Sequence, residues 1–113
     1  MSERDAFVCY LLDMLQAFGR VSARPMFGGH GIYRDGVIFA IVVDDTLYLK
    51  ADDQNRALYE NEGLRRFSYM KNGKPCFMSY YAAPEEAMED KALLYHWAGQ
   101  AYEAGLRGHK IAE

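Results

Sequence analysis

The sequence predicts an α+β fold in which helices form one layer against a five-stranded, mainly antiparallel sheet. Apolar residues recur at helical spacing near both ends of the chain, and short β-rich runs separated by turn signals lie between them. The 113 residues are half hydrophobic and contain no repeat, linker or low-complexity segment. They predict a single two-layer domain, residues 1–113, with the element order α-β(3)-α-β(2)-α.

The first helix is predicted from about Ser2 to Phe18, where Gly19 would end it. One side of this helix is apolar and comprises Phe7, Val8, Leu11, Met14, Leu15 and Phe18. Because these residues share a face at 3.6 residues per turn, we expect that face to pack against the sheet.

The segment Arg24–Tyr33 is predicted to be the first strand, although it contains three glycines in four positions, Gly28, Gly29 and Gly31. Glycine weakens a strand and usually marks a bulge or the close approach of another backbone. We therefore interpret the glycines as space for a strand pressed against a helix. A phosphate-binding loop is excluded, because its glycines would have to lead directly into a helix.

The next strand, Val37–Val43, follows the hairpin turn Arg34-Asp35-Gly36 and is apolar at every position. An antiparallel strand with one solvent-exposed face would alternate polar and apolar residues. This strand is therefore predicted to be central, with both faces covered. A chain with so few helices cannot easily cover both faces, so we hypothesise a homodimer contact on the second one.

A third strand is predicted at Leu47–Lys50, followed by a short surface helix that Asp52 or Asp53 would cap and that ends near Asn61 and Gly63. Arg66–Met70 and Cys76–Tyr81 then form a second hairpin around the turn Asn72-Gly73. These two strands complete the five-stranded sheet.

The last helix is predicted to begin at Pro84, to break around Glu89-Asp90 and to end near Gly105. Its wide apolar arc comprises Leu93, Leu94, Trp97, Ala98, Ala101 and Tyr102. The tail after Leu106 is expected to be frayed.

The composition argues against several kinds of function. The net charge of −3 offers no general attraction to nucleic acid or to an anionic membrane, and no apolar run is long enough to span a bilayer. With Cys9 and Cys76 as its only cysteines and no signal peptide, the chain is expected in the reducing cytoplasm.

No catalytic, cofactor-binding or metal-binding residues are predicted. His30, His96 and His109 are scattered, and none lies at metal-ligand spacing from another His or Cys. No nucleophile elbow or set of paired catalytic carboxylates stands out. We therefore expect no enzymatic activity; of the histidines, His30 alone is worth testing, for a ligand pocket near the glycine-rich segment.

Direct nucleic-acid binding is the alternative function. Arg65, Arg66, Lys71 and Lys74 lie around the second hairpin and are interleaved with aromatic residues. Solvated hairpin ends account for them better, because Lys and Arg also discourage edge-to-edge association of strands. Direct nucleic-acid contact is accordingly disfavoured.

The glycine-rich segment also carries a family resemblance. Its motif comprises Arg24, Met26, Phe27, Gly28, Gly29, Gly31 and Tyr33. The similarity extends through the apolar second strand to Leu47-Tyr48-Leu49-Lys50, Lys74-Pro75, Tyr80-Tyr81 and Pro84-Glu85-Glu86. With this motif the chain resembles the amino-terminal domain of the TfoX/Sxy family of competence regulators, over almost its whole length. The best-known members carry a second, carboxy-terminal domain, so we expect this chain to be a stand-alone version.

The resemblance implies a fold similar to the type III secretion chaperones, which dimerise. It also implies a transcriptional co-regulator that acts with the cyclic-AMP receptor protein or RNA polymerase through protein contacts, without a cofactor. The motif residues, together with His30, are the candidate interaction surface that the resemblance suggests.

Overall fold

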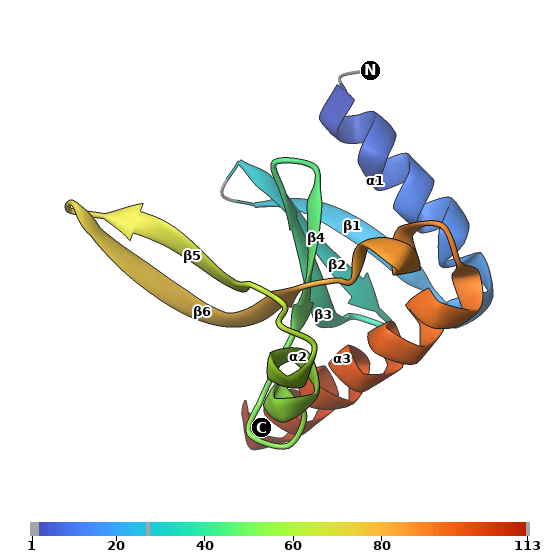
Figure 1. Cartoon of the computed structure of the whole chain (residues 1–113). Helices are drawn as coiled ribbons and strands as arrows, with labels where there is room; N and C mark the ends of the chain where they lie inside the picture. The colour runs from blue at the N-terminus through green and yellow to red at the C-terminus, as the bar shows by residue number, and fades with distance from the viewer. Residues whose placement is uncertain (1–2, 27, 113) are drawn as a thin grey trace.

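The structure is a computed structural model, and it describes residues 3–26 and 28–112 (Figure 1). The helices are α1 (Glu3–Met14), α2 (Arg56–Asn61) and α3 (Lys91–Ala112), with two 3₁₀ helices, η1 (Gln16–Phe18) and η2 (Glu85–Met88). The strands are β1 (Val21–Met26), β2 (Gly29–Arg34), β3 (Val37–Val43), β4 (Thr46–Lys50), β5 (Arg66–Lys71) and β6 (Lys74–Ala82). The predicted α+β class and antiparallel sheet are confirmed.

The sheet has six strands in the order β1-β2-β3-β4-β6-β5, and each neighbouring pair is antiparallel. The predicted count of five is wrong, because Arg24–Tyr33 is not one strand. The chain reverses between Met26 and Gly29, which pair with each other, and β1 and β2 form a hairpin. Gly28 has a φ of +75°, a conformation that glycine adopts without strain, so it belongs to a turn and not to a bulge.

Helices α1 and α3 cover one face of the sheet, and the β5–β6 hairpin projects away from them (Figure 1). Both predicted apolar faces are confirmed. The buried side chains of the helix layer include Val8, Leu11, Met14 and Leu15 of α1 and Leu94, Trp97, Ala98 and Ala101 of α3. They share one core with Ile32, Phe39, Ala40 and Val42 of the sheet.

The predicted helix ends need correction. Helix α1 ends at Met14, and only a 3₁₀ turn continues to Phe18. The break near Glu89 is confirmed, but α3 runs on to Ala112 instead of ending near Gly105. A methyl group at Gly105 would lie 2.4 Å from the carbonyl oxygen of Ile38. Gly105 therefore lies close against the backbone of β3, and it does not stop the helix.

Helix α2 lies on the surface, as predicted, but one of its six residues is an anchor that the sequence did not indicate. Its residue Tyr59 is fully buried. The Tyr59 ring stacks on Tyr81, with centroids 5.2 Å apart and planes within 2°, and lies 5.5 Å from the Trp97 ring. This aromatic cluster, Tyr59, Tyr81 and Trp97, anchors α2 between β6 and α3.

Strand β3 is central and largely buried, as predicted, and a bulge helps it to serve both faces of the sheet. Ile32 pairs with Ala40 and Tyr33 pairs with Ile38, so Phe39 is the additional residue. Phe39 and Ala40 both pack into the helix-side core, whereas Ile41 packs on the opposite face. The similarity to type III secretion chaperones remains a prediction.

Candidate interaction face

The face of the sheet opposite α1 and α3 has its own small core, which we call the open face. Ile41, Tyr48 and Tyr80 are buried there, with Phe67 and Met78 of the β5–β6 hairpin packed against them. The ring centroids of Tyr48 and Phe67 are 4.8 Å apart. The chain's own hairpin therefore covers part of the second face of β3, for which the sequence suggested a dimer contact.

An apolar groove remains between this hairpin and the other end of the face. Its volume is about 330 Å³. The residues of the apolar groove are Met26, His30, Ile41, Val43, Phe67, Tyr69 and Met78. Residues of β1, β2 and β3 form one wall and residues of β5 and β6 form the other, so the fold brings together segments that are far apart in the sequence.

Cationic side chains lie against aromatic rings of the open face. The guanidinium carbon of Arg24 lies 5.1 Å from the centre of the Tyr33 ring, and the Lys50 ammonium lies 5.1 Å from that of Tyr80. Burial, and secondarily the neighbouring Tyr33, raises the pKa of Tyr80 to about 12, so its hydroxyl stays neutral at physiological pH. Such contacts between a cation and an aromatic ring stabilise the rim of the open face.

The motif from Arg24 to Tyr33 is only partly a surface. Gly29 and Gly31 are buried, whereas Arg24 is exposed; Phe27 lies outside the described residues. A methyl group at Gly29 would lie 2.1 Å from the carbonyl oxygen of Val42, so a close backbone approach is confirmed there. The approaching backbone is strand β3, however, and not the helix that the sequence suggested.

The remaining motif residues divide between the two faces. The sulfur of Met26 and the ring of Tyr33 lie over Gly31 on the open face. His30 pairs with Val42, whose side chain packs into the helix-side core. Since directly paired residues share a face, the strand register directs the His30 side chain to the helix side, although His30 is also among the residues that line the apolar groove. The apolar groove thus lies beside His30, and a ligand pocket near this residue stays a prediction.

The basic residues of the second hairpin do not form one cluster. Arg65 Nη2 donates a hydrogen bond to the Tyr48 hydroxyl at 3.3 Å, and Arg66 Nε donates to the Met78 carbonyl at 3.0 Å. Lys71 and Lys74 pair at the far tip of the hairpin. Arg66 and Lys71 are five positions apart in β5, which is roughly 16 Å along a strand. The proposed nucleic-acid surface is thus divided into two engaged arginines and two exposed lysines.

Other candidate chemistry is sparse in the described part of the chain. Residues 3–26 and 28–112 contain no group of three His, Cys, Asp or Glu side chains placed to hold a metal ion. His96 and His109 are exposed, and neither Cys9 nor the half-buried Cys76 is in a disulfide. Among the same residues, no helix has the length and apolar character of a membrane span.

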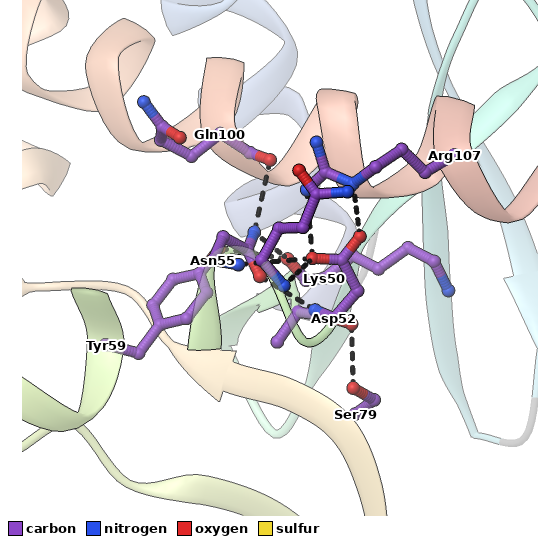
Figure 2. Close-up of polar contacts among 9 residues, drawn as sticks. Lys50, Asp52, Asn55, Tyr59, Ser79, Gln100 and Arg107 are labelled. Atoms are coloured by element: carbon purple, nitrogen blue, oxygen red, sulfur yellow. Dashed lines mark hydrogen bonds and ion pairs between the residues drawn. The ribbon is translucent and has the colours of Figure 1, made fainter. Parts of the chain in front are cut away.

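Sequence reasoning missed a polar junction that ties the segment after β4 to α3 (Figure 2). Asp52 accepts hydrogen bonds from Arg107 Nε at 2.5 Å and Nη2 at 2.9 Å. The bond from Arg107 lowers the pKa of the Asp52 carboxyl, and burial opposes this only in part. Asn55 is buried and its Nδ2 donates to the carbonyls of Lys50 and Gln100, both at 3.2 Å. The junction is fully hydrogen-bonded within the chain, which makes it structural.

A local signal for this junction does exist in the sequence. The side chain of Asp52 accepts from the backbone N–H groups of Gln54 and Asn55, in the turn that precedes α2. The N-cap residue of α2 is Asn55, without a side-chain capping bond, so the predicted cap by Asp52 or Asp53 is wrong. Asn55 Oδ1 accepts in return from the Asp52 N–H at 2.7 Å. The Asp-x-x-Asn spacing therefore indicates a closed turn, but the partner Arg107 lies in another element and has no local signal.

The fold and the groove define an α+β domain whose sheet is covered by helices on one face and only in part on the other. Comparison with family models finds the TfoX N-terminal domain over residues 13–105, so the chain belongs to that family. The family resemblance is thereby confirmed.

Two curated relatives are similar to this chain. The DNA transformation protein TfoX1 of Aliivibrio fischeri is 28% identical over 91 residues, which cover 80% of this chain and 44% of that protein. Protein Sxy of Escherichia coli is 25% identical over 95 residues, which cover 84% of this chain and 46% of that protein. The chain thus spans less than half the length of either relative.

Proposed function

We propose that this chain is a non-enzymatic regulatory domain of the competence-regulator type, acting as a transcriptional co-regulator through protein contacts in the cytoplasm. Membership of the TfoX N-terminal domain family supports the regulatory part, as does the similarity to a protein named for DNA transformation. The expected partners are the cyclic-AMP receptor protein and RNA polymerase.

The observation that carries the proposal is an exposed apolar patch on the hairpin side that faces away from the apolar groove. Met70 is 67% exposed and Phe77 is 59% exposed. Met70 pairs with Pro75 and Ser68 pairs with Phe77, so alternation places Met70, Pro75 and Phe77 on one side of the hairpin. We call these three residues the outer patch. Adjacent large apolar groups in water are typical of a protein-binding site, unlike a single exposed leucine.

A protein partner fits this surface better than nucleic acid. The guanidinium of Arg66 lies 5.8 Å from the centre of the Phe77 ring and bonds the chain's own backbone, so it is partly engaged. Phosphate binding needs several free cations that release counterions together. Lys71 and Lys74 are the two exposed lysines of the hairpin tip, and they keep direct nucleic-acid binding as the alternative.

The test measures binding of the chain to the cyclic-AMP receptor protein and to RNA polymerase by calorimetry. We expect Phe77→Ser to weaken binding by about 10-fold or more, as for an interface anchor. Leu58→Ser is the matched control, because Leu58 is 42% exposed on α2, away from the patch, and should change binding less than about 2-fold.

Two results would contradict the proposal. In the first, neither protein binds. In the second, DNA binds with a steep salt dependence that is lost in Lys71→Glu/Lys74→Glu, which supports the alternative.

A further inference from the structure

We propose that two copies of this chain associate about a two-fold axis, each placing the inner side of its β5–β6 hairpin on the apolar groove of the other. The occupant of the groove is thus a second copy of the chain. This association uses the side of the hairpin opposite the outer patch, so it is independent of the proposed regulatory contact.

The amount of exposed surface supports a missing partner. The accessible surface of the chain is 7047 Å². A folded monomer of 12.9 kDa is expected to expose about 6,300 Å². The difference is close to what one partner contributes to a standard interface, about 800 Å².

The β5–β6 hairpin is largely exposed. Its strand β5 is exposed at five of six positions, and β6 joins β4 through the pairs Tyr48–Ala82, Leu49–Tyr81 and Lys50–Tyr80 only. A two-stranded ribbon is marginally stable in water unless one face is buried. The inner side still leaves Tyr69 45% exposed beside the groove, so its apolar face needs further cover.

The charges around the groove are self-complementary. Asp44 and Asp45 follow the groove residue Val43, whereas Lys71 lies two residues beyond the groove residue Tyr69, with Lys74 paired to it. All four charged side chains are exposed, and no ion pair within the described part of the chain involves them. One wall of the groove thus leads into an acidic turn and the other wall into a basic turn.

A two-fold axis across the middle of the groove converts this polarity into two matching contacts. Rotation by half a turn about such an axis brings the lysine tip of one copy to the acidic turn of the other, and the reverse contact follows by symmetry. The apolar walls then meet between the two charged contacts. This is the pattern of an apolar centre with a polar rim that stable interfaces show.

The first experiment measures association of the whole chain by sedimentation equilibrium over about 1–100 µM protein. We expect a monomer–dimer equilibrium, and we expect Tyr69→Glu to raise the dimer Kd by about 30-fold or more. Met70→Glu is the matched control, because Met70 is the next residue of the same strand on the opposite side, and it should change the Kd less than about 3-fold. Circular dichroism of both variants establishes that they are folded.

The second experiment tests the charges with Lys71→Glu/Lys74→Glu and with Asp44→Asn/Asp45→Asn. Asparagine is chosen because both aspartates have positive φ, 51° and 55°, which asparagine tolerates. Each double variant should raise the Kd by about 5-fold at low salt and less at high salt. The variant with all four changes should then raise the Kd by a smaller factor than the product of the two factors measured for the double variants.

Three outcomes would overturn the inference: a wild-type monomer at about 100 µM, equal effects of Tyr69→Glu and Met70→Glu, or a monomer that instead binds single-stranded DNA through Tyr69. Loss of binding to the regulatory partner alone would leave the dimer intact, so the two proposals fail separately.

Discussion

At the scale of single residues, glycines decide how closely the elements of this fold approach one another. Gly29 lies against the carbonyl of Val42, and Gly105 lies against that of Ile38. Gly99 belongs to the same helix as Gly105, but nothing lies within 4 Å of where its methyl group would be. The same substitution should therefore have opposite effects at two positions of α3.

We expect Gly105→Ala to destabilise the protein and Gly99→Ala to stabilise it. Alanine is the better helix former by about 1 kcal/mol, and Gly99→Ala should gain about 0.5–1 kcal/mol. At Gly105 the clash with β3, at 2.4 Å, outweighs this gain, and a net loss of about 1–3 kcal/mol is expected. Urea unfolding at equal concentration measures both; stabilisation by Gly105→Ala would show that α3 can move away from β3.

The sequence identifies such glycines but not their neighbours. A close backbone approach near Gly29 was predicted, since a glycine inside a strand often marks a position where a side chain would not fit. The approaching strand could not be predicted, because β2 and β3 meet through register and not through a local signal. At Gly105, the common use of glycine as a helix stop led to the wrong helix end.

At the scale of elements, the polar junction of Asp52, Asn55 and Arg107 fixes the β4–α2 connection to α3. Figure 2 shows Asn55 between the two segments, with Asp52 beneath Arg107. Both side chains of the Asp52–Arg107 pair are more than two thirds buried, so solvent screens this pair less than a surface ion pair. The junction should therefore contribute to stability in a pH-dependent way.

The pH dependence follows from the lowered pKa of Asp52. Because the folded-state pKa lies below the unfolded value, the stabilisation is present above about pH 4 and is lost as the pH falls through the folded-state pKa. Asp52→Asn should cost about 1–2 kcal/mol at neutral pH and little at about pH 2. Thermal unfolding over this pH range measures the difference between the variant and the wild type.

Asp53→Asn is the control for this experiment. Asp53 is adjacent in the sequence, its side chain is 98% exposed, and its contact with Arg56 is a surface ion pair of 3.7 Å. It should leave the pH profile nearly unchanged. If Asp53→Asn changed the pH profile as much as Asp52→Asn does, the effect would be due to net charge and not to the junction.

The single buried residue of α2 illustrates what local patterns omit. The sequence shows the apolar pair Ala57 and Leu58, and both side chains are exposed. Tyr59 is buried instead, because its ring stacks on Tyr81 and its hydroxyl donates to the Lys50 carbonyl at 2.9 Å. A tyrosine with a polar partner can be buried as fully as a leucine, and sequence periodicity in six residues cannot show this.

At the scale of the whole molecule, stability should be unevenly distributed. Strand β3 lies in the middle of the sheet, under α3 on one face and the hairpin on the other, whereas β5 is an exposed edge. We expect amide hydrogen exchange to be slowest in Val37–Val43 and much faster in Arg66–Lys71 at low protein concentration. Equal protection of both strands in dilute solution would contradict this distribution.

Protein concentration adds a second arm to the exchange experiment. If two copies cover the hairpins of one another, protection of Arg66–Lys71 should rise with concentration, while that of Val37–Val43 stays constant. Mass spectrometry of peptic fragments resolves the two segments. The Tyr69→Glu variant should show no such rise.

The whole fold was more predictable than the site. The class, the antiparallel sheet, the central strand Val37–Val43 and the buried faces of α1 and α3 follow from periodicity and turn chemistry. The groove does not follow from these local patterns. It forms because the pairing of β4 with β6 places Phe67 and Tyr69 near Val43. Only the fully apolar strand indicated in advance that the second face would need a cover.

The aromatic cluster that anchors α2 also makes the chain its own fluorescent reporter. Trp97 is the single tryptophan, it is 9% exposed, and the Tyr59 ring lies 5.5 Å away. Its emission therefore originates from the place where α2, β6 and α3 meet, with tyrosine neighbours close enough to transfer excitation to it. Unfolding, and any loosening of α2 alone, can be followed by the red shift of one native chromophore without a label.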